Sequence, residues 1–328
     1  MSEVAIRPRL DRADVERIVR DALGADLEFT GHEEFKDGFF NAAHALDLAD
    51  GRRLVVKVAP DKGLKLLSYE VDLMATEIEC FERGLAAGAP MPRVWHADPD
   101  AGVLVIDRLE GVPLFKVRSE IPADRLLALR REIGAQAAKF ATATGGHFGY
   151  PRKSGNTMAD TWSDAFLAMI GDVLDDIEEQ GTGLPRPVAA IRAFLEGERA
   201  LLDEVTRPAL VHFDLWDGNI FVRREGDDWA FEAFIDGERA FYGDPLAELV
   251  SLQMVPEEEF PAAVEGFLGR PMTAGEERRL ALYRTYIMLI LVAECKIRGF
   301  DAEVEANQLK WASETLERDF TAFGIGES

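Results

Sequence analysis

The spacing of apolar side chains divides the chain into a strand-rich first part and a helical remainder. Residues 11–23 and 64–87 repeat apolar side chains at helical spacing, whereas shorter apolar runs bounded by glycine, proline or aspartate are typical of strands. The dipeptide Asp50-Gly51 is a strong hairpin signal between the second and third of these runs. The predicted strands begin at Leu27, Phe39, Arg53, Pro90 and Gly102.

Beyond residue 109 the helical spacing dominates, and one hairpin interrupts it. The hairpin joins residues 219–225 to residues 229–236 across Gly226-Asp227. A sheet-rich N-lobe in residues 1–108 and a mainly helical C-lobe in residues 109–328 make a two-lobed α+β protein. The predicted helices of the C-lobe span residues 122–143, 160–179, 187–205, 245–253, 257–267, 274–298 and 302–323.

Composition narrows the choice of partners. A net charge of −23 over 328 residues argues against a nucleic-acid partner, because phosphate backbones are bound by basic surfaces. Focused in a cleft, this charge would favour a cationic small molecule, but an acidic surface that aids solubility explains it equally well. The polar N-terminus and the lack of a long apolar run lead us to expect a cytoplasmic protein without membrane contact. No feature implies a protein partner, and Cys80 and Cys295 give no disulfide framework.

The stretch "PALVHFDLWDGNIFV" places four polar residues between two apolar runs that suit buried strands. Asp217-Gly218 is a turn signal, so the polar residues lie on a loop. Asp and Asn are ordinary loop formers, and the loop alone therefore does not establish a function. The four residues are His212, Asp214, Asp217 and Asn219.

The hairpin that follows brings a further carboxylate to this loop. Asp236 ends its second strand and returns close to Asn219 if the hairpin pairs as predicted. Carboxylate and amide oxygens are the hard ligands that Mg²⁺ requires. Asp214, five residues before Asn219, could then accept a hydroxyl proton beside the metal. For His212 we expect a structural role, bracing the loop by hydrogen bonds.

The N-lobe supplies a cation for the same chemistry. Lys57 interrupts the apolar strand "LVVKVAP", and a buried lysine needs an anion or a paired carboxylate. Glu77 on the following helix can be that carboxylate, leaving Lys57 to hold the phosphates of a nucleotide. The alternative is that Lys57 snorkels to solvent from an edge strand.

These residues resemble the aminoglycoside phosphotransferase and choline kinase family, which consists of protein-kinase-like small-molecule kinases. The family loop H-x-D-x-x-x-x-N matches His212, Asp214 and Asn219, and its I-D segment followed by G-D-P matches "IDGERAFYGDP". The resemblance implies Asp214 as catalytic base, Asn219 and Asp236 as Mg²⁺ ligands, and Lys57 with Glu77 as the ion pair of the nucleotide site. It also implies that Gly38 and Asn41 approach the phosphates and that Ile106 and Leu109 line the adenine. For Glu238 we expect a side chain that faces the acceptor or, alternatively, forms a salt bridge with Arg239 or Arg223.

The chain departs from protein kinases in ways that point to a small acceptor. Phe213 replaces the arginine of H-R-D, and no G-x-G-x-x-G loop is present. The expected phosphate-covering turn carries Gly31, Glu33 and Glu34. We therefore expect transfer of the γ-phosphoryl group of ATP, or alternatively GTP, to a hydroxyl of a small cationic acceptor. The first acceptors to consider are aminoglycosides or other antibiotics, which would give the enzyme a role in antibiotic resistance. Choline-like amino alcohols and sugars are the next acceptors to consider. The alternative hypothesis for the function is a nucleotide-binding pseudokinase with a regulatory role.

Overall fold

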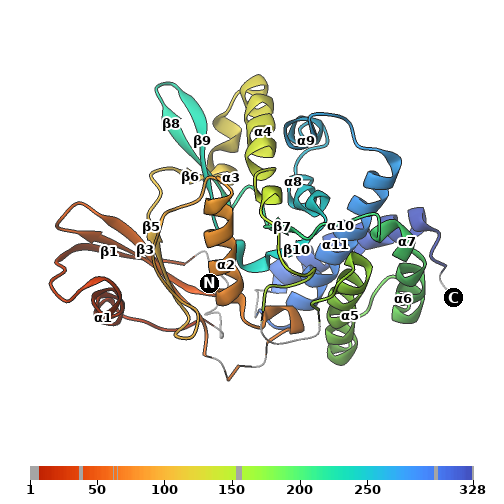
Figure 1. The fold of residues 1–328 in the computed structure, drawn as a ribbon, viewed down its shortest axis with the longest axis horizontal. Helices are drawn as coiled ribbons and strands as arrows, with labels where there is room; N and C mark the ends of the chain where they lie inside the picture. The colour runs from red at the N-terminus through yellow and green to blue at the C-terminus, as the bar shows by residue number, and fades with distance from the viewer. Residues whose placement is uncertain are drawn as a thin grey trace.

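The computed structural model describes residues 7–36, 40–61, 63–64, 66–152, 157–298 and 302–326. A five-stranded antiparallel sheet forms the first part of the chain, and helices make up most of the second (Figure 1). The two-lobed, protein-kinase-like α+β fold is thus confirmed. The sheet has the order β1-β2-β3-β5-β4, built from β1 (Phe29–Phe35), β2 (Ala42–Leu48), β3 (Arg53–Val58), β4 (Val94–Asp98) and β5 (Val103–Asp107).

The alternation of side chains along β3 gives the sheet two different faces. Leu54 and Val56 pack in a separate core with Val15 and Val19 of α1 (Arg12–Leu23). Lys57 points to the other face, where it meets α2 (Leu73–Ala86). Because β3 pairs with β2 on one side and β5 on the other, Lys57 is on an interior strand, and snorkelling from an edge strand is excluded.

Two predicted boundaries in this part are wrong. The helix expected over residues 64–87 begins only at Leu73, because Asp72 has left-handed backbone (φ 57°) after the short 3₁₀ turn η1 (Ser68–Glu70). Strand β1 also continues to Phe35. Gly31, Glu33 and Glu34 therefore belong to a paired strand and not to a phosphate-covering turn.

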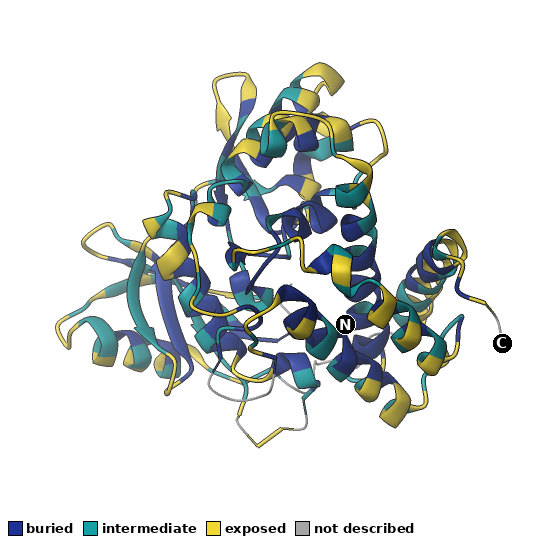
Figure 2. Cartoon of the chain, turned by 45° about the vertical axis from the view of Figure 1, so that its right-hand side comes forward, coloured by how far each residue is buried: buried dark blue, intermediate teal, exposed yellow. Residues whose placement is uncertain are grey.

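The second part is built around the long helix α10 (Ala274–Glu294), and Figure 2 colours much of the interior of this part as buried. Tyr283 of α10 packs edge-on against the buried ring of Phe166. Several predicted helices are shorter than expected. Residues 187–205 break into two at Glu198, residues 245–253 begin as 3₁₀, and residues 122–143 end as a helix at Ala137. The helix predicted over residues 257–267 begins at Phe260, and the one predicted over residues 274–298 ends at Glu294. The helices are α3 (Leu114–Val117), α4 (Ala123–Ala137), α5 (Trp162–Gln180), α6 (Val188–Gly197), α7 (Arg199–Leu202), α8 (Leu249–Leu252), α9 (Phe260–Leu268), α10 (Ala274–Glu294) and α11 (Ala302–Phe323), with 3₁₀ turns η2 (Arg118–Glu120), η3 (Phe140–Thr142), η4 (Gly237–Arg239) and η5 (Pro245–Glu248).

Two small sheets hold the polar loop. The predicted hairpin forms as β8 (Ile220–Glu225) and β9 (Asp228–Phe234), and β6 (Val112–Pro113) joins its edge. The short strand β7 (Ala209–Val211) pairs with β10 (Phe241–Gly243), which the sequence did not predict. The loop between β7 and β8 is therefore fixed at both ends. Cys80 and Cys295 are buried and unbridged. Among the described residues, no helix has the length and apolar character needed to cross a membrane.

Candidate active site

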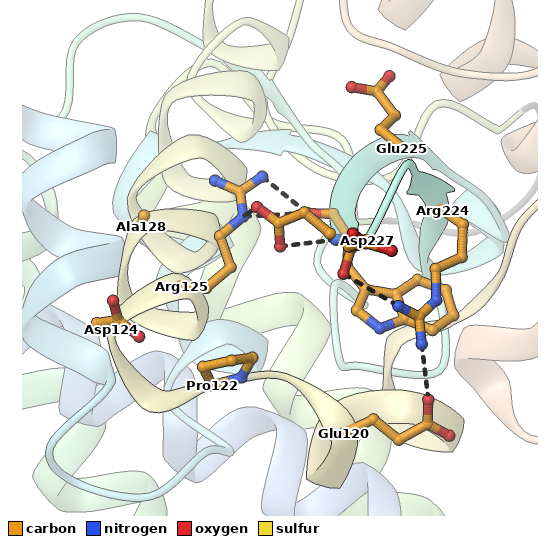
Figure 3. Close-up of a pocket in the computed structure, with 10 residues that line it drawn as sticks. Glu120, Pro122, Asp124, Arg125, Ala128, Arg224, Glu225 and Asp227 are labelled. Carbon is orange, nitrogen blue, oxygen red and sulfur yellow. Dashed lines mark hydrogen bonds and ion pairs between the residues drawn. The ribbon is translucent and has the colours of Figure 1, made fainter.

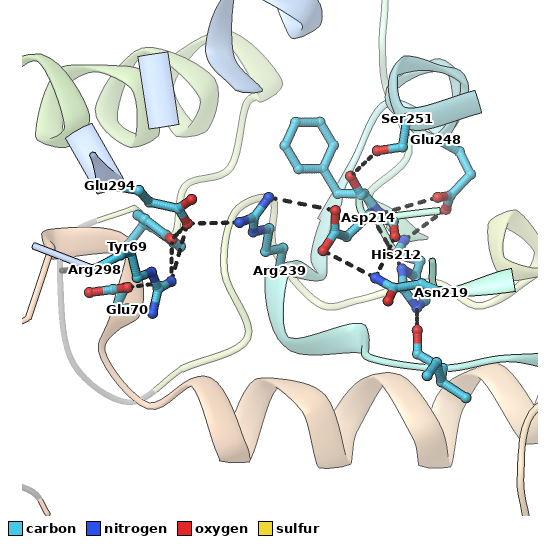
Figure 4. Close-up of polar contacts among 12 residues, drawn as sticks. Tyr69, Glu70, His212, Asp214, Asn219, Arg239, Glu248, Ser251, Glu294 and Arg298 are labelled. Carbon is cyan, nitrogen blue, oxygen red and sulfur yellow. Dashed lines mark hydrogen bonds and ion pairs between the residues drawn. The ribbon is translucent and has the colours of Figure 1, made fainter. Parts of the chain in front are cut away.

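A buried carboxylate, that of Glu248, holds the backbone of the loop between β7 and β8. Glu248 accepts hydrogen bonds from the backbone amides of His212 (2.7 Å) and Phe213 (3.1 Å) (Figure 4). Ser251 Oγ donates to the Phe213 carbonyl at 2.8 Å. Phe213 is fully buried with left-handed backbone (φ 67°), a conformation that costs a non-glycine residue free energy. The three hydrogen bonds offset that cost and fix the direction in which the chain leaves Phe213.

His212 braces this loop and carries no charge at neutral pH. It is completely buried, and burial lowers its pKa to about 4. Its Nε2 lies 3.0 Å from the Ile235 carbonyl, and its Nδ1 lies 3.3 Å from the amide nitrogen of Asp214. A neutral ring that donates through Nε2 and accepts through Nδ1 satisfies both contacts. The bracing role expected from the sequence fits this geometry.

The Asp214 side chain is largely buried, in a setting that favours a proton. Burial raises its pKa to about 6; the Arg239 guanidinium opposes this rise, and the Asp236 carboxylate adds to it. Asn219 Nδ2 donates to the Asp214 carbonyl (2.8 Å) and to its Oδ2 (3.2 Å), and Arg239 Nη1 lies 3.5 Å from Oδ1. A carboxylate with a pKa near neutrality is suited to accept a proton in catalysis.

Arg239 belongs to a buried network that extends away from the loop (Figure 4). Its Nη2 contacts Glu294 Oε1 at 2.7 Å, and Arg298 lies 3.1 Å from the same oxygen and 2.7 Å from Glu70 Oε1. The Tyr69 hydroxyl also bonds Glu294. Burial raises the pKa of Glu294, but Arg239 and Arg298 outweigh it and the net shift is downward. The network thus keeps Arg239 in place beside Asp214.

The lysine of β3 joins the two parts of the chain. Lys57 Nζ donates to Glu77 on α2 and to Asp236 Oδ1 at 2.6 Å. Burial lowers the pKa of Lys57, but Asp236 and Glu77 outweigh it, so the ammonium form is stabilised. Burial raises the pKa of Glu77 to about 7, and Lys57 opposes this rise. The predicted ion pair therefore forms, with a second carboxylate attached to it.

The carboxylates around Lys57 offer oxygen donors to a metal ion. Oxygen atoms of Glu77, Asp236 and Glu238 lie within 4.8 Å of one another. Asn41 Nδ2 donates to Glu238 (3.2 Å) and Glu77 (3.4 Å). Burial and the nearby Asp236 carboxylate raise the pKa of Glu238 well above its usual range, which is the effect of crowding acids together. Hard oxygen donors of this kind fit Mg²⁺.

The structure places the other predicted residues as follows. Asn219 lies next to the Asp236 backbone, since the Ile235 amide donates to the Asn219 carbonyl at 3.0 Å, but its side chain faces Asp214. Ile106 is buried on β5, and Leu109 is half-buried just after that strand. Glu238 contacts Asn41 and not the arginines that the sequence suggested as its partners. Gly38 lies outside the described residues.

Sequence reasoning missed Glu248 and the network around Arg239. A signal for Glu248 was available, because it is the only charged residue in the apolar run "PLAELVSL". Glu294 likewise follows nine uncharged residues in α10, with Arg298 four positions later. A buried charge must be paired, so both positions predict a partner. The identity of that partner depends on long-range packing and is not contained in either run.

A separate surface pocket of about 520 Å³ lies between the start of α4 and the tip of the β8–β9 hairpin (Figure 3). None of the site residues described above lines it. Its two arginines are already engaged, Arg125 with the Trp229 carbonyl at 2.7 Å and Arg224 with Glu120 at 3.4 Å. We therefore place the chemistry at the loop between β7 and β8 and not at this pocket.

Known proteins resemble the chain over most of its length. A protein named probable ketoamine kinase YniA, from Escherichia coli strain K12, is 25% identical over 284 residues, which are 84% of this chain and 90% of that protein. A solved Thermobifida fusca YX-ER1 structure named as a fructosamine-3-kinase has a TM-score of 0.66 at 20% identity, covering 94% of this chain and all of that one. The choline kinase LicA of Streptococcus pneumoniae gives 0.63 at 16% identity, covering 93% and 99%.

The family assignment rests on a match to a family model. The model of the phosphotransferase enzyme family, abbreviated APH, matches residues 32–283, well over half of the chain. This span includes Lys57, Glu77, Asp214, Asn219, Asp236, Glu238 and Arg239, but not Glu294 and Arg298 of the buried network. The expected enzyme class, an ATP-dependent phosphotransferase with an alcohol group as acceptor, is confirmed at the level of the family. The chain belongs to the phosphotransferase enzyme family.

Proposed function

We propose that this enzyme transfers the γ-phosphoryl group of ATP to a hydroxyl of an amine-bearing sugar, with Asp214 as the base. The observation that carries the proposal is the assembly of one site from both parts of the chain. Lys57 on β3 is bonded to Asp236, which follows β9, and Asp236 lies close enough to influence the pKa of Asp214. Phosphoryl transfer needs a positioned hydroxyl, a base and charge stabilisation, and these residues offer all three.

Each residue has a separate task in this proposal. Asp214 orients the acceptor hydroxyl and takes its proton, and Arg239 keeps the carboxylate from becoming too basic. Lys57 holds the nucleotide phosphates and Glu77 holds Lys57. Asn219 and Asp236 would bind Mg²⁺, which when bound neutralises charge on the phosphates. Glu238, close to both Glu77 and Asp236, is a further oxygen donor at the edge of this group.

The nucleotide base is proposed to lie at the junction of the two lobes. Ile106 and Leu109 flank the end of β5, where the chain leaves the five-stranded sheet, and would line the adenine. Residues 1–108 would then form the nucleotide-binding lobe and residues 109–328 the acceptor-binding lobe. ATP is the proposed donor and GTP the alternative. One structural neighbour is described as a streptomycin–ATP ternary complex and another as a GDP complex.

An exposed aromatic pair beside the loop supports an acceptor of this class. Trp216, two residues after Asp214, stacks on Phe115 of α3 with ring centroids 5.7 Å apart. The two side chains are 43% and 49% exposed. Aromatic faces attract ammonium groups and pack against apolar ligand surface, so this pair suits an amine-bearing sugar. Two of the relatives carry the names probable ketoamine kinase and putative fructosamine-3-kinase, which makes ketoamines the first acceptors to test.

The test is ADP release from Mg-ATP with four acceptor classes: an N-fructosyl amine, aminoglycosides, choline and simple sugars. The control is Asp214→Asn, which keeps the size of the side chain but not its basicity. We expect turnover with an amine-bearing sugar and loss of turnover in the control, with nucleotide binding retained. Mass spectrometry of the product then identifies the phosphorylated hydroxyl.

The panel also separates the alternatives. Turnover with choline alone would reject the sugar acceptor but keep the mechanism. Equal turnover by the Asp214→Asn enzyme would reject Asp214 as the base. Failure of the protein to bind Mg-ATP in a thermal-shift assay would favour the noncatalytic alternative, for which the family match gives no support.

A further inference from the structure

Asp217 lies inside the loop that carries Asp214 and Asn219, yet its side chain is turned away from them. It accepts both Nη1 and Nη2 of Arg130, the latter at 2.7 Å, and Arg130 Nε donates to Glu259 at 2.9 Å. The Arg130 side chain, on α4, is completely buried. A bidentate arginine–carboxylate pair fixes the direction as well as the distance of its partner.

A second arginine closes this group into a neutral network of four residues. Arg118 of η2 bonds Glu259 and lies 3.8 Å from Asp217 Oδ2. The backbone of Asp217 is held as well, because its carbonyl accepts the Phe115 amide at 3.1 Å. Four separate elements, namely η2, α3, α4 and the residue preceding α9, thus converge on one position of the catalytic loop.

The helices behind Arg130 form a rigid support. A Cβ atom added to Gly134 of α4 would lie 2.1 Å from the Ala263 carbonyl oxygen of α9, and one added to Gly266 of α9 would lie 1.9 Å from the Arg131 carbonyl oxygen. The two backbones are therefore in direct contact, and Arg130 cannot shift without moving both helices. The loop is attached to this pair at a point three residues after Asp214 and two before Asn219.

We propose that Arg130 is a positioning residue for phosphoryl transfer, which acts by holding Asp217 and thereby sets the spacing between Asp214 and Asn219. The inference rests on the proposed function for its catalytic consequence, but the placement of the loop can be measured without turnover. A displacement of about 1 Å at a reacting group can cost on the order of 100-fold in rate. We expect kcat to depend on Arg130 more strongly than the KM for ATP does, because Lys57, which would hold the phosphates, lies outside this loop.

The decisive protein is the double variant Arg130→Met with Asp217→Leu. Removing one partner leaves a buried charge unpaired and can simply unfold the protein, whereas removing both replaces the pair by apolar groups of similar volume. Glu259 keeps Arg118 as its partner in this variant. The matched control is Arg131→Met, which removes an exposed arginine from the next position of the same helix.

Two readouts are compared in the double variant and the control. The first is kcat and KM for ATP, with the acceptor found by the panel or with water as the slow acceptor. The second is amide hydrogen exchange in residues 212–220, where the Asn219 amide donates to the Trp216 carbonyl at 2.9 Å. We expect the double variant to melt near the wild-type temperature, to lose kcat by about 100-fold and to exchange faster in this segment.

Wild-type kcat and wild-type exchange in a folded double variant would overturn the proposal and leave Arg130 a purely structural ion-pair partner. Faster exchange without loss of kcat would also overturn it, because the loop would then move without consequence. If the wild-type enzyme shows no turnover at all, the proposed function fails on its own. In that case unchanged exchange in the double variant would still refute the anchoring role of Arg130, and faster exchange would support it.

Discussion

The proton affinity of Asp214, the proposed base, depends on two neighbours of opposite charge. Burial raises its pKa to about 6, Arg239 acts against that rise, and Asp236 acts with it. Because the base works only when ionised, kcat/KM must fall as the pH decreases through this value. We predict an ascending limb with an apparent pKa near 6, measured over a pH series at saturating Mg-ATP. A rate independent of pH down to the ordinary range of a carboxylate would contradict this setting for Asp214.

Arg239→Met tests the electrostatic origin of that limb. The guanidinium lies 3.5 Å from Asp214 and favours the ionised carboxylate, so its loss should raise the pKa of Asp214. The ascending limb should then move to higher pH, with kcat partly recovered in alkaline buffer. Arg270→Met, which removes an exposed arginine at a distant helix start, is the control. An unshifted limb would mean that Arg239 only packs against Asp214.

Among single residues, the sequence identifies the proposed reactive groups and misses the buried residues that hold them. Asp214, Asn219, Asp236 and Lys57 could be predicted because their types and spacing reflect local chemistry. Glu294 and Arg239 are 55 positions apart and meet only when α10 packs beneath the loop. A pattern read along the chain gives no such pairing, because it contains no information on which buried charges face one another.

Among the elements, the loop between β7 and β8 depends most on support from a neighbour. Glu248→Ala would leave the amides of His212 and Phe213 without their acceptor in a buried place, next to a residue with unfavourable backbone. Each unsatisfied amide costs roughly 1–3 kcal/mol, so we predict a loss of about 3 kcal/mol in the free energy of unfolding. Urea unfolding measures it. Glu258→Ala removes an exposed glutamate from the following segment and should change stability little.

The elements themselves show where local patterns succeed. The β8–β9 hairpin and α11 agree with their predicted ranges, because a Gly-Asp turn and continuous helical spacing are local signals. The start of α2 was placed too early, since the apolar residues before it pack as 3₁₀ and extended chain against the second part. The sequence did not predict strand β10, because a strand of three residues is too short to show an alternation of apolar and polar side chains. Its partner β7 also lies at least 30 positions earlier in the chain.

For the whole molecule, the contact between Lys57 and Asp236 joins two residues 179 positions apart. If Lys57 holds the nucleotide phosphates as proposed, nucleotide binding is linked to the arrangement of the two parts. A ligand that binds only the folded state stabilises it by about 2.7 kcal/mol at a concentration 100 times its Kd. We predict that saturating Mg-ATP raises the Tm of the wild type and that Lys57→Met abolishes most of this increase. Lys310→Met, on the exposed surface of α11, should respond like the wild type. An undiminished increase in the Lys57 variant would place the phosphates elsewhere.

The contact between Lys57 and Asp236 has a consequence for the order in which ligands bind. Without nucleotide, the ammonium group already neutralises Asp236 at 2.6 Å, so a free divalent cation must compete with an internal one. Phosphates that attract Lys57 would remove this competitor and leave Asp236 open to the metal. Metal and nucleotide should therefore increase each other's affinity by the same factor, as thermodynamic reciprocity requires. In this view the lysine acts as a tethered, exchangeable counter-ion, and the enzyme resists loading with metal until a nucleotide is present.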